Sequence, residues 1–213
     1  MARTAGSDGE KTRAAVCEAA ARLIARHGFE AVTMRQLAAE VGVQAAALYR
    51  YFPSKQDLLH ALMETHMQAL AASWEAARPD NAGPARELAA FVANHIRFHV
   101  ERRHETHVSN MELRSLTPEH LSAILRLRNA YEKNLRQILR EGADNGQFSL
   151  DDPGLTAMAL IQMMTGVIVW FRPGARLSAE EVTASYLGMA LRLAGANTNM
   201  ERQSHGQHAE YRV

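Results

Sequence analysis

Two histidines one helical turn apart, His95 and His99, are the first residues whose types and spacing suggest chemistry. Imidazoles at this spacing can chelate a metal ion, and His104 and His107 follow closely. No other feature of the sequence completes a ligand set. We therefore expect each of these histidines to be hydrogen-bonded or partly solvated, and we predict neither a metal nor a cofactor.

Catalysis would be another use of the same histidines. His95, His99 and Glu112 could serve a small all-helical hydrolase or transferase. The sequence, however, shows no serine–histidine elbow, phosphate-binding loop or paired-carboxylate motif. We predict no enzymatic activity and no catalytic residue, and the small enzyme is kept as an alternative.

A basic residue, Arg128, interrupts the apolar stripe of a helix expected at 119–141. A guanidinium is not buried without an anionic partner, which is either an internal Asp or Glu or the anionic group of a ligand. Arg114, Arg126 and Arg172 are weaker candidates for the second role. The residues predicted to line a ligand pocket are Phe91, His95, His99, Arg114, Leu125, Arg128, Met163, Trp170 and Arg172.

A different kind of surface is predicted for a short helix at about 44–51. Small or uncharged residues at its start would let it enter the major groove of DNA. Gln44 could pair with adenine, and Ala45 or Ala46 could touch a thymine methyl. Tyr49, Tyr51 and Lys55 would then contact phosphates. The alternative is a helical hairpin that touches no DNA.

Helical spacing dominates the elements that must position these residues, and no alternating strand pattern is convincing. Gly28 ends a first helix, Thr33 and Gln36 form a capping box, and Gly42 separates two short helices in a helix-turn-helix at 33–52. Further helices are expected at 55–77, 85–102, 103–116 (shorter or broken), 118–141, 153–171 and 178–194, followed by a frayed tail at 196–213. Asp152 is expected to cap the helix at 153–171, and Ser178 with Glu181 to form a second capping box. The prediction is an all-α protein of about nine helices.

Composition narrows the class of protein further. The chain has 213 residues, of which 47% are hydrophobic and 22% charged, so it can form a real core. One cysteine excludes an intramolecular disulfide. Residues 1–55 carry eight basic and five acidic side chains, a weak indication of an anionic partner at that end. The apolar run at 155–171 is expected to be a helix buried on most sides, and we predict a cytoplasmic protein without a membrane partner.

The segment 33–55, with Ala-Leu-Tyr-Arg-Tyr-Phe-Pro-Ser-Lys at 47–55, resembles the DNA-binding domain of the tetracycline-repressor (TetR) family. It departs from the family pattern at Gln44 and at Ala46–Ala47. The resemblance implies a three-helix DNA-binding head (9–69) and a ligand-binding and dimerisation body (70–195). It adds Thr33 and Arg35 to the expected DNA contacts. It also implies a homodimer through the last two long helices, with interface residues Val167, Ile168, Leu187 and Leu191.

The body resembles regulators of fatty-acid, sterol and aromatic-acid catabolism more loosely, through Asn94 to His99, Glu112 to Leu116 and Trp170 to Pro173. The implied function is a homodimeric repressor that a small, anionic, largely apolar effector releases from a palindromic operator in double-stranded DNA. A CoA thioester is the first choice of effector. The remaining alternative is a helical interaction protein whose DNA-binding head is not functional.

Overall fold

Residues 5–196 are described by the computed structural model, and they form helices and connecting turns without a strand. The predicted tail lies outside the described residues except for Ala196. The elements are α1 (Ala5–His27), α2 (Met34–Val41), α3 (Ala45–Leu48), α4 (Lys55–Ala77), α5 (Pro84–Glu101), α6 (Arg103–Met111), the 3-10 turn η1 (Leu113–Ser115), α7 (Pro118–Asp144), α8 (Pro153–Thr165), α9 (Val167–Trp170) and α10 (Ala179–Leu193). The all-α prediction is confirmed.

Local capping signals explain why these helices begin and end where they do. Thr33 and Gln36 form the predicted capping box of α2, and Ser178 and Glu181 form the equivalent box of α10. Asp152 caps α8 by accepting hydrogen bonds from the backbone N–H groups of Gly154 and Leu155. These predicted boundaries are confirmed because they depend only on contacts within one turn.

Two predicted helices differ from the structure. The helix predicted at 44–51 is helical only over Ala45–Leu48, and Gln44 is its extended N-cap residue. Residues 49–51 form turns because Pro53 disfavours helical backbone just before it. The helix predicted at 153–171 is interrupted at Gly166, whose N–H bonds to the carbonyls of Gln162 and Met164. Glycine stabilises a helix interior least among non-proline residues, so the break falls there.

The chain divides into two compact units, described separately below: one contains the residues up to Ala72 and Glu101–Asn129, and the other Ser73–Val100 and the residues from Ala130 onward. The three boundaries fall within helices α4, α5 and α7.

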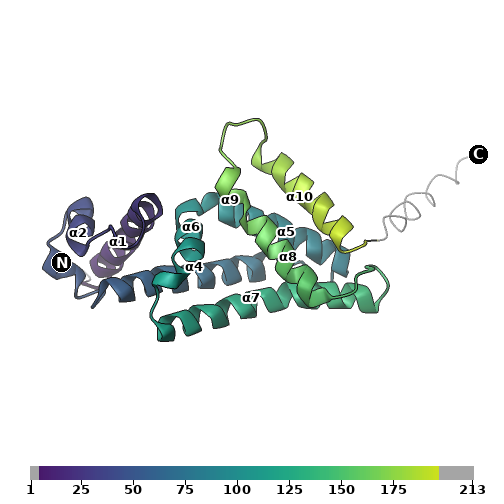
Figure 1. Ribbon diagram of the computed structural model, residues 1–213, viewed down its shortest axis with the longest axis horizontal. Helices are drawn as coiled ribbons and strands as arrows, with labels where there is room; N and C mark the ends of the chain where they lie inside the picture. The colour runs from purple at the N-terminus through teal and green to yellow at the C-terminus, as the bar shows by residue number, and fades with distance from the viewer. Residues whose placement is uncertain (1–4, 197–213) are drawn as a thin grey trace, which may run out of the picture. The chain divides into compact units, whose positions relative to one another are not determined.

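One hydrophobic core holds the first unit together, and Figure 1 shows α1 and α2 in purple beside the start of α4. Its buried members include Ile24, Leu37, Leu48, Phe52, Leu58, Met63, Val108 and Ile124. Val108 comes from α6 and Ile124 from α7, so these helices share a core with the helix-turn-helix. Because cores are close-packed, a shift of α6 must be accommodated by the helices at the N-terminus.

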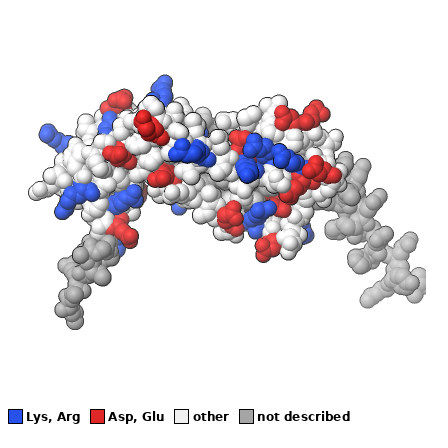
Figure 2. Space-filling view, turned by 90° about the horizontal axis from the view of Figure 1, so that it is seen from below, with Lys and Arg blue, Asp and Glu red and all other residues white. Residues whose placement is uncertain are grey.

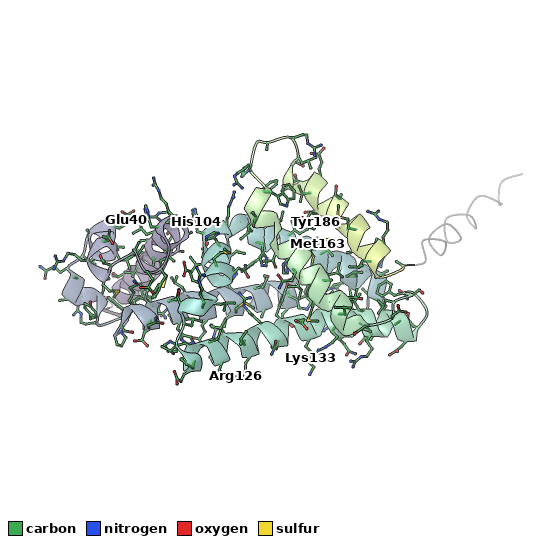
Figure 3. The ribbon with its side chains drawn as sticks, in the orientation of Figure 1. Glu40, His104, Arg126, Lys133, Met163 and Tyr186 are labelled. Atoms are coloured by element: carbon green, nitrogen blue, oxygen red, sulfur yellow. The ribbon has the colours of Figure 1, made fainter. Side chains whose placement is uncertain are left out.

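The second unit has its own core. Figure 1 shows α8 and α10 side by side, and the two helices are in contact. Buried residues include Trp74, Phe91, Tyr131, Leu160, Met164, Val167, Val182 and Ala190. Figure 3 shows Met163 of α8 and Tyr186 of α10 in the region where these helices run together.

Candidate functional site

The turn between α2 and α3 sets the geometry of the helix-turn-helix. Gly42 has the left-handed conformation (φ 74°), which glycine adopts without strain. The N–H of Val43 then bonds to the carbonyl of Ala38 at 2.9 Å, which closes the turn. Predicted DNA contacts Thr33, Arg35, Gln44, Ala46 and Tyr49 are all exposed. The structure brings them together on α2 and α3.

Three other predicted DNA contacts are more enclosed. Ala45 is half-buried, and the ring of Tyr51 lies beside Gly9 of α1. The Lys55 ammonium donates to the carbonyl of Glu30 at 3.2 Å and lies 4.1 Å from the centre of the Phe29 ring. Lys55 thus holds the turn between α1 and α2. Arg50, which the sequence interpretation overlooked, lies next to Tyr49. Its side chain is exposed and therefore more accessible to DNA than that of Lys55.

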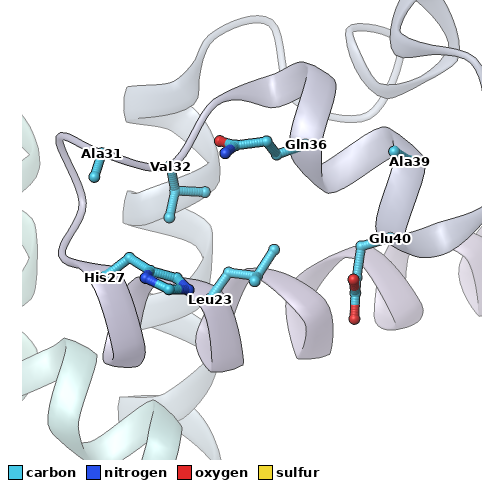
Figure 4. Close-up of a pocket in the computed structure, with 7 residues that line it drawn as sticks. All are labelled: Leu23, His27, Ala31, Val32, Gln36, Ala39 and Glu40. Atoms are coloured by element: carbon cyan, nitrogen blue, oxygen red, sulfur yellow. The ribbon is translucent and has the colours of Figure 1, made fainter.

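The outer surface of this unit also carries a groove between α1 and α2, drawn in Figure 4. Its volume is about 520 Å³, and its lining residues are Leu23, His27, Ala31, Val32, Gln36, Ala39 and Glu40. Glu40 pairs with Arg22 at 2.9 Å. On the face drawn in Figure 2, basic side chains are interspersed with acidic ones. The weak positive charge of residues 1–55 therefore does not form one continuous basic surface on that face.

Arg128 has an unexpected environment in the first unit. Its Nη2 donates to the backbone carbonyl of Ser109 at 2.6 Å and to Oδ1 of Asn110 at 3.1 Å. The internal Asp or Glu partner that was one of the two sequence hypotheses is not found among the described residues. Burial lowers the pKa of Arg128, because desolvation disfavours its charge. A partly buried cation thus faces only neutral acceptors.

Further polar atoms around Arg128 lack hydrogen-bond partners within residues 5–196. They are Nε of Arg128, Oγ1 of Thr106 and Oγ of Ser109. Thr106 and Ser109 are buried on one face of α6, and Asn110 donates to the carbonyl of Thr106 at 2.8 Å. Unpaired buried polar groups are costly and rare in folded proteins. The unpaired Nε–H of Arg128 and the two unpaired hydroxyl groups of α6 can each donate a hydrogen bond to an oxyanion.

Sequence reasoning identified Arg128 but missed Thr106 and Ser109. Their spacing of three residues, which places two hydroxyls on one face of a helix, was the signal available. Leu125 and Arg114 are exposed instead of lining this site. Figure 3 shows Arg126 on the outer side of α7, where it donates to Ser122 at 2.9 Å.

In the second unit His95 and His99 form a buried stacked pair, with ring centres 3.9 Å apart. His95 bonds to the Tyr131 hydroxyl (3.2 Å) and the Thr165 hydroxyl (3.0 Å), and His99 to the carbonyl of His95 (2.7 Å). Burial raises the pKa of Tyr131 far above its usual range, so this hydroxyl stays protonated. His95 and His99 are therefore hydrogen-bonded within the fold, as expected. Among the described residues no group of three metal-ligating side chains occurs.

The other predicted pocket residues of this unit occupy different surroundings. Phe91 is buried and packs edge-on against Trp74, whose indole N–H has no acceptor among residues 5–196. Met163 is half-buried, and Trp170 is 48% exposed with its ring stacked on Tyr186. Arg172 is exposed and donates to the carbonyls of Val169 and Phe171, so it closes the end of α9.

Helices α8 to α10 carry a large exposed apolar surface. Val167 and Ile168, predicted for a dimer interface, are buried within the chain itself, and Leu187 and Leu191 are half-buried. The exposed apolar residues are Leu155, Met158, Val169, Trp170, Met189 and Leu193. The stretch Pro153–Trp170 is long and apolar enough to span a membrane. Only 28% of this stretch is buried within the chain. The expectation of a helix buried on most sides was therefore wrong for the chain on its own.

Comparisons with known proteins match this arrangement. Residues 16–62 match the family described as "Bacterial regulatory proteins, tetR family". Residues 81–194 match "Tetracyclin repressor-like, C-terminal domain", and this match alone spans more than half of the 213 residues. The chain belongs to the TetR family.

Individual TetR-family relatives cover nearly the whole chain. The HTH-type transcriptional repressor KstR2 of Mycobacterium tuberculosis is 28% identical over 196 residues, which are 90% of this chain and 96% of the repressor. A Rhodococcus RHA1 regulator of the tetR family superposes with a TM-score of 0.83 at 28% identity and covers 87% of this chain and 98% of its own. AibR, solved with isovaleryl coenzyme A and operator DNA, gives a TM-score of 0.78 at 27% identity over 87% of this chain and 99% of its own. This TetR-family protein is therefore a DNA-binding transcriptional regulator, as predicted.

Proposed function

We propose that this TetR-family regulator is a cytoplasmic homodimeric repressor that leaves its operator when an acyl-CoA binds. It acts by binding and not by catalysis. The predicted division into a DNA-binding head (9–69) and an effector-binding and dimerisation body (70–195) is part of this proposal. The observation that carries the effector is the oxyanion-binding cluster of Arg128, Thr106 and Ser109.

The head supplies the DNA-binding step. Exposed Gln44 and Ala46 would face the major groove, where an amide side chain recognises adenine and a small residue permits close approach. The exposed phosphate contacts would be Thr33, Arg35, Tyr49 and Arg50. Lys55, already bonded to the carbonyl of Glu30, would act by holding the head in shape.

The exposed apolar residues of α8 to α10 support the homodimer. Apolar surface of this extent needs a partner, and a second copy of the same helices offers a self-complementary one. Two heads on one dimer would recognise two half-sites about one DNA turn apart, roughly 34 Å, or a multiple of it. Leu155, Met158 and Trp170 then contribute more contact area than the predicted Val167 and Ile168, which are buried already.

The oxyanion-binding cluster supports the effector class. The thioester oxygen or a phosphate of an acyl-CoA would bond to the Arg128 guanidinium and to the hydroxyls of Thr106 and Ser109. The names of relatives agree with this chemistry: AibR was solved with isovaleryl coenzyme A, KstR2 is a ketosteroid regulator, and a fatty acid metabolism regulator protein of Bacillus subtilis is 26% identical over 153 residues. The effector contacts expected from the sequence at Phe91, His95, His99, Met163 and Trp170 of the second unit stay predictions.

Selection of bound sequences from a random DNA library tests the DNA-binding step. We expect a palindromic site. Gln44→Ala should change the preferred base at one position of each half-site, at a cost of about 1–3 kcal/mol. Arg50→Ala should weaken binding to all sequences alike and lower the slope of log K against log salt by about 1. Tyr49→Phe should likewise leave the base preference unchanged.

Each alternative function predicts a different outcome. A Gln44→Ala protein that selects the same sequence as the wild type would mean that α3 does not contact bases as proposed. Retention of no DNA at all by the wild-type protein would favour the helical interaction protein or the small enzyme.

A further inference from the structure

Glu112, directly after α6, connects the end of α6 to the turn that precedes the helix-turn-helix. Its Oε1 accepts a hydrogen bond from the backbone N–H of Phe29 at 3.1 Å, and its Oε2 accepts one from the Ser115 hydroxyl at 2.8 Å. Phe29 lies in the turn between α1 and α2, and its side chain is buried in the core. The preceding Gly28 is left-handed (φ 81°), and Oε1 lies 3.8 Å from the place a Cβ would occupy there. The carboxylate therefore lies directly against this turn.

A second hydrogen bond ties the same segment to α4. The Gln56 amide donates to the carbonyl of Ser115 at 2.7 Å from the first turn of α4. Lys55, its neighbour, donates to Glu30 in the turn that Glu112 also binds. Residues 112–115, the turn after α1 and the start of α4 thus form one hydrogen-bonded group that includes both ends of the helix-turn-helix.

The backbone of Glu112 connects this residue, through the last turn of α6, to the oxyanion-binding cluster. The Glu112 N–H bonds to the carbonyl of Val108 at 3.0 Å, so Glu112 moves with the last turn of α6. Arg128 holds that turn through the carbonyl of Ser109 and the side chain of Asn110. An anion that engages the guanidinium competes with the Ser109 carbonyl for its N–H groups. Loss of that hydrogen bond would free the last turn of α6 and, with it, Glu112.

We propose that Glu112 is the positioning residue that transmits effector binding at the Arg128 cluster to the helix-turn-helix. This inference rests on the proposed function, since it assumes that the cluster binds the effector. A ligand shifts the head only if the two arrangements of the α6 end differ in affinity for it. Coupling is reciprocal, so operator binding must in turn change the end of α6, whether or not an effector is present.

Because this coupling is reciprocal, the role of Glu112 can be tested with DNA alone, without an effector. Hydrogen–deuterium exchange is measured on the full chain with and without a DNA duplex chosen by selection. In the wild type, DNA should slow exchange in residues 33–50 and change exchange in 103–116 by about fivefold or more. In Glu112→Ala, DNA should still slow exchange in residues 33–50 but should no longer change exchange in residues 103–116. Glu112→Gln should keep both, because its amide oxygen still accepts the Phe29 N–H.

Two further variants complete the exchange experiment, one as a control and one as a replacement for Glu112→Ala. Glu119→Ala removes an exposed carboxylate from the first turn of α7 and should behave like the wild type. Glu112→Met preserves side-chain length without an acceptor and replaces Glu112→Ala if the alanine variant does not fold. The inference is overturned if DNA still changes exchange in 103–116 when residue 112 offers no oxygen, or if Glu112→Gln behaves like Glu112→Ala.

Isovaleryl-CoA provides the second arm, measured by calorimetry and by release of labelled DNA. Glu112→Ala should bind it with a Kd within about threefold of the wild type, while the release of DNA falls by about tenfold or more. If the wild type binds no isovaleryl-CoA, the proposed effector is wrong, whereas the exchange experiment still decides the role of Glu112. Loss of isovaleryl-CoA binding in Glu112→Ala would show that Glu112 belongs to the effector site itself and would overturn its transmitting role.

Discussion

Replacing Met158 by aspartate should convert the proposed homodimer into a folded monomer and weaken operator binding by about 100-fold or more. Met158 lies on α8 and is 48% exposed in the single chain, so the substitution leaves the core of the unit intact. In the proposed dimer the same carboxylate would be buried without a partner, which costs far more than the lost apolar contact. The two heads would then bind DNA independently and lose their effective concentration at the second half-site.

Light scattering and DNA titration on the same samples measure both effects. Met111→Asp is the matched control, because Met111 is also an exposed methionine but lies at the end of α6 in the other compact unit. It should remain dimeric. A Met158→Asp protein that stays dimeric at micromolar concentration would show that α8 does not form the interface.

Removing the Arg128 side chain should abolish the response to acyl-CoA and, because the Ser109 carbonyl at the end of α6 loses its donor, should also weaken operator binding. The variant Arg128→Ala loses charge-assisted hydrogen bonds worth about 1.5–3 kcal/mol, so isovaleryl-CoA should bind about 10- to 100-fold more weakly. It also leaves the Ser109 carbonyl without its donor, so we expect the free energy of unfolding to fall by about 1–3 kcal/mol. Arg128→Lys keeps the charge but not the planar fork, and should recover only part of the affinity.

Arg126→Ala is the control for this experiment. Arg126 lies two residues earlier on α7, is exposed, and bonds only locally to Ser122. Removal of the Arg126 side chain should change neither the Kd of isovaleryl-CoA nor the melting temperature. If Arg128→Ala melts earlier yet binds isovaleryl-CoA as the wild type does, Arg128 is a structural clamp on α6 and not part of the effector site.

The parts of the fold that the sequence predicted are those determined by short-range contacts. The capping boxes at Thr33 and Ser178, the left-handed Gly42 and the Asp152 cap each involve residues within one turn. Such contacts leave a recognisable pattern in the sequence. The helix-turn-helix and its exposed residues could therefore be located before the structure was known.

The parts that the sequence did not predict depend on distant segments. The partners of Arg128 are a backbone carbonyl and an amide on another helix, not the acidic side chain that charge alone suggested. Glu112 was considered as a member of an alternative catalytic group and as part of a stretch that resembles other regulators, yet it accepts a hydrogen bond from the N–H of Phe29, 83 positions away in sequence. The apolar pattern of α8 likewise could not distinguish residues that are buried, such as Leu160, from residues that are exposed in the single chain, such as Met158.

The two tryptophans of the chain lie in opposite surroundings. Trp74 is fully enclosed against Phe91, whereas Trp170 is 48% exposed beside Tyr186 on the apolar surface of α9 and α10. Indole emission moves to shorter wavelength when water is excluded from the ring. Trp74 therefore supplies a constant background, and Trp170 an optical signal of self-association that needs no label. Dilution should move the emission toward longer wavelength as dimers dissociate, and a Trp170→Phe variant should lose that shift.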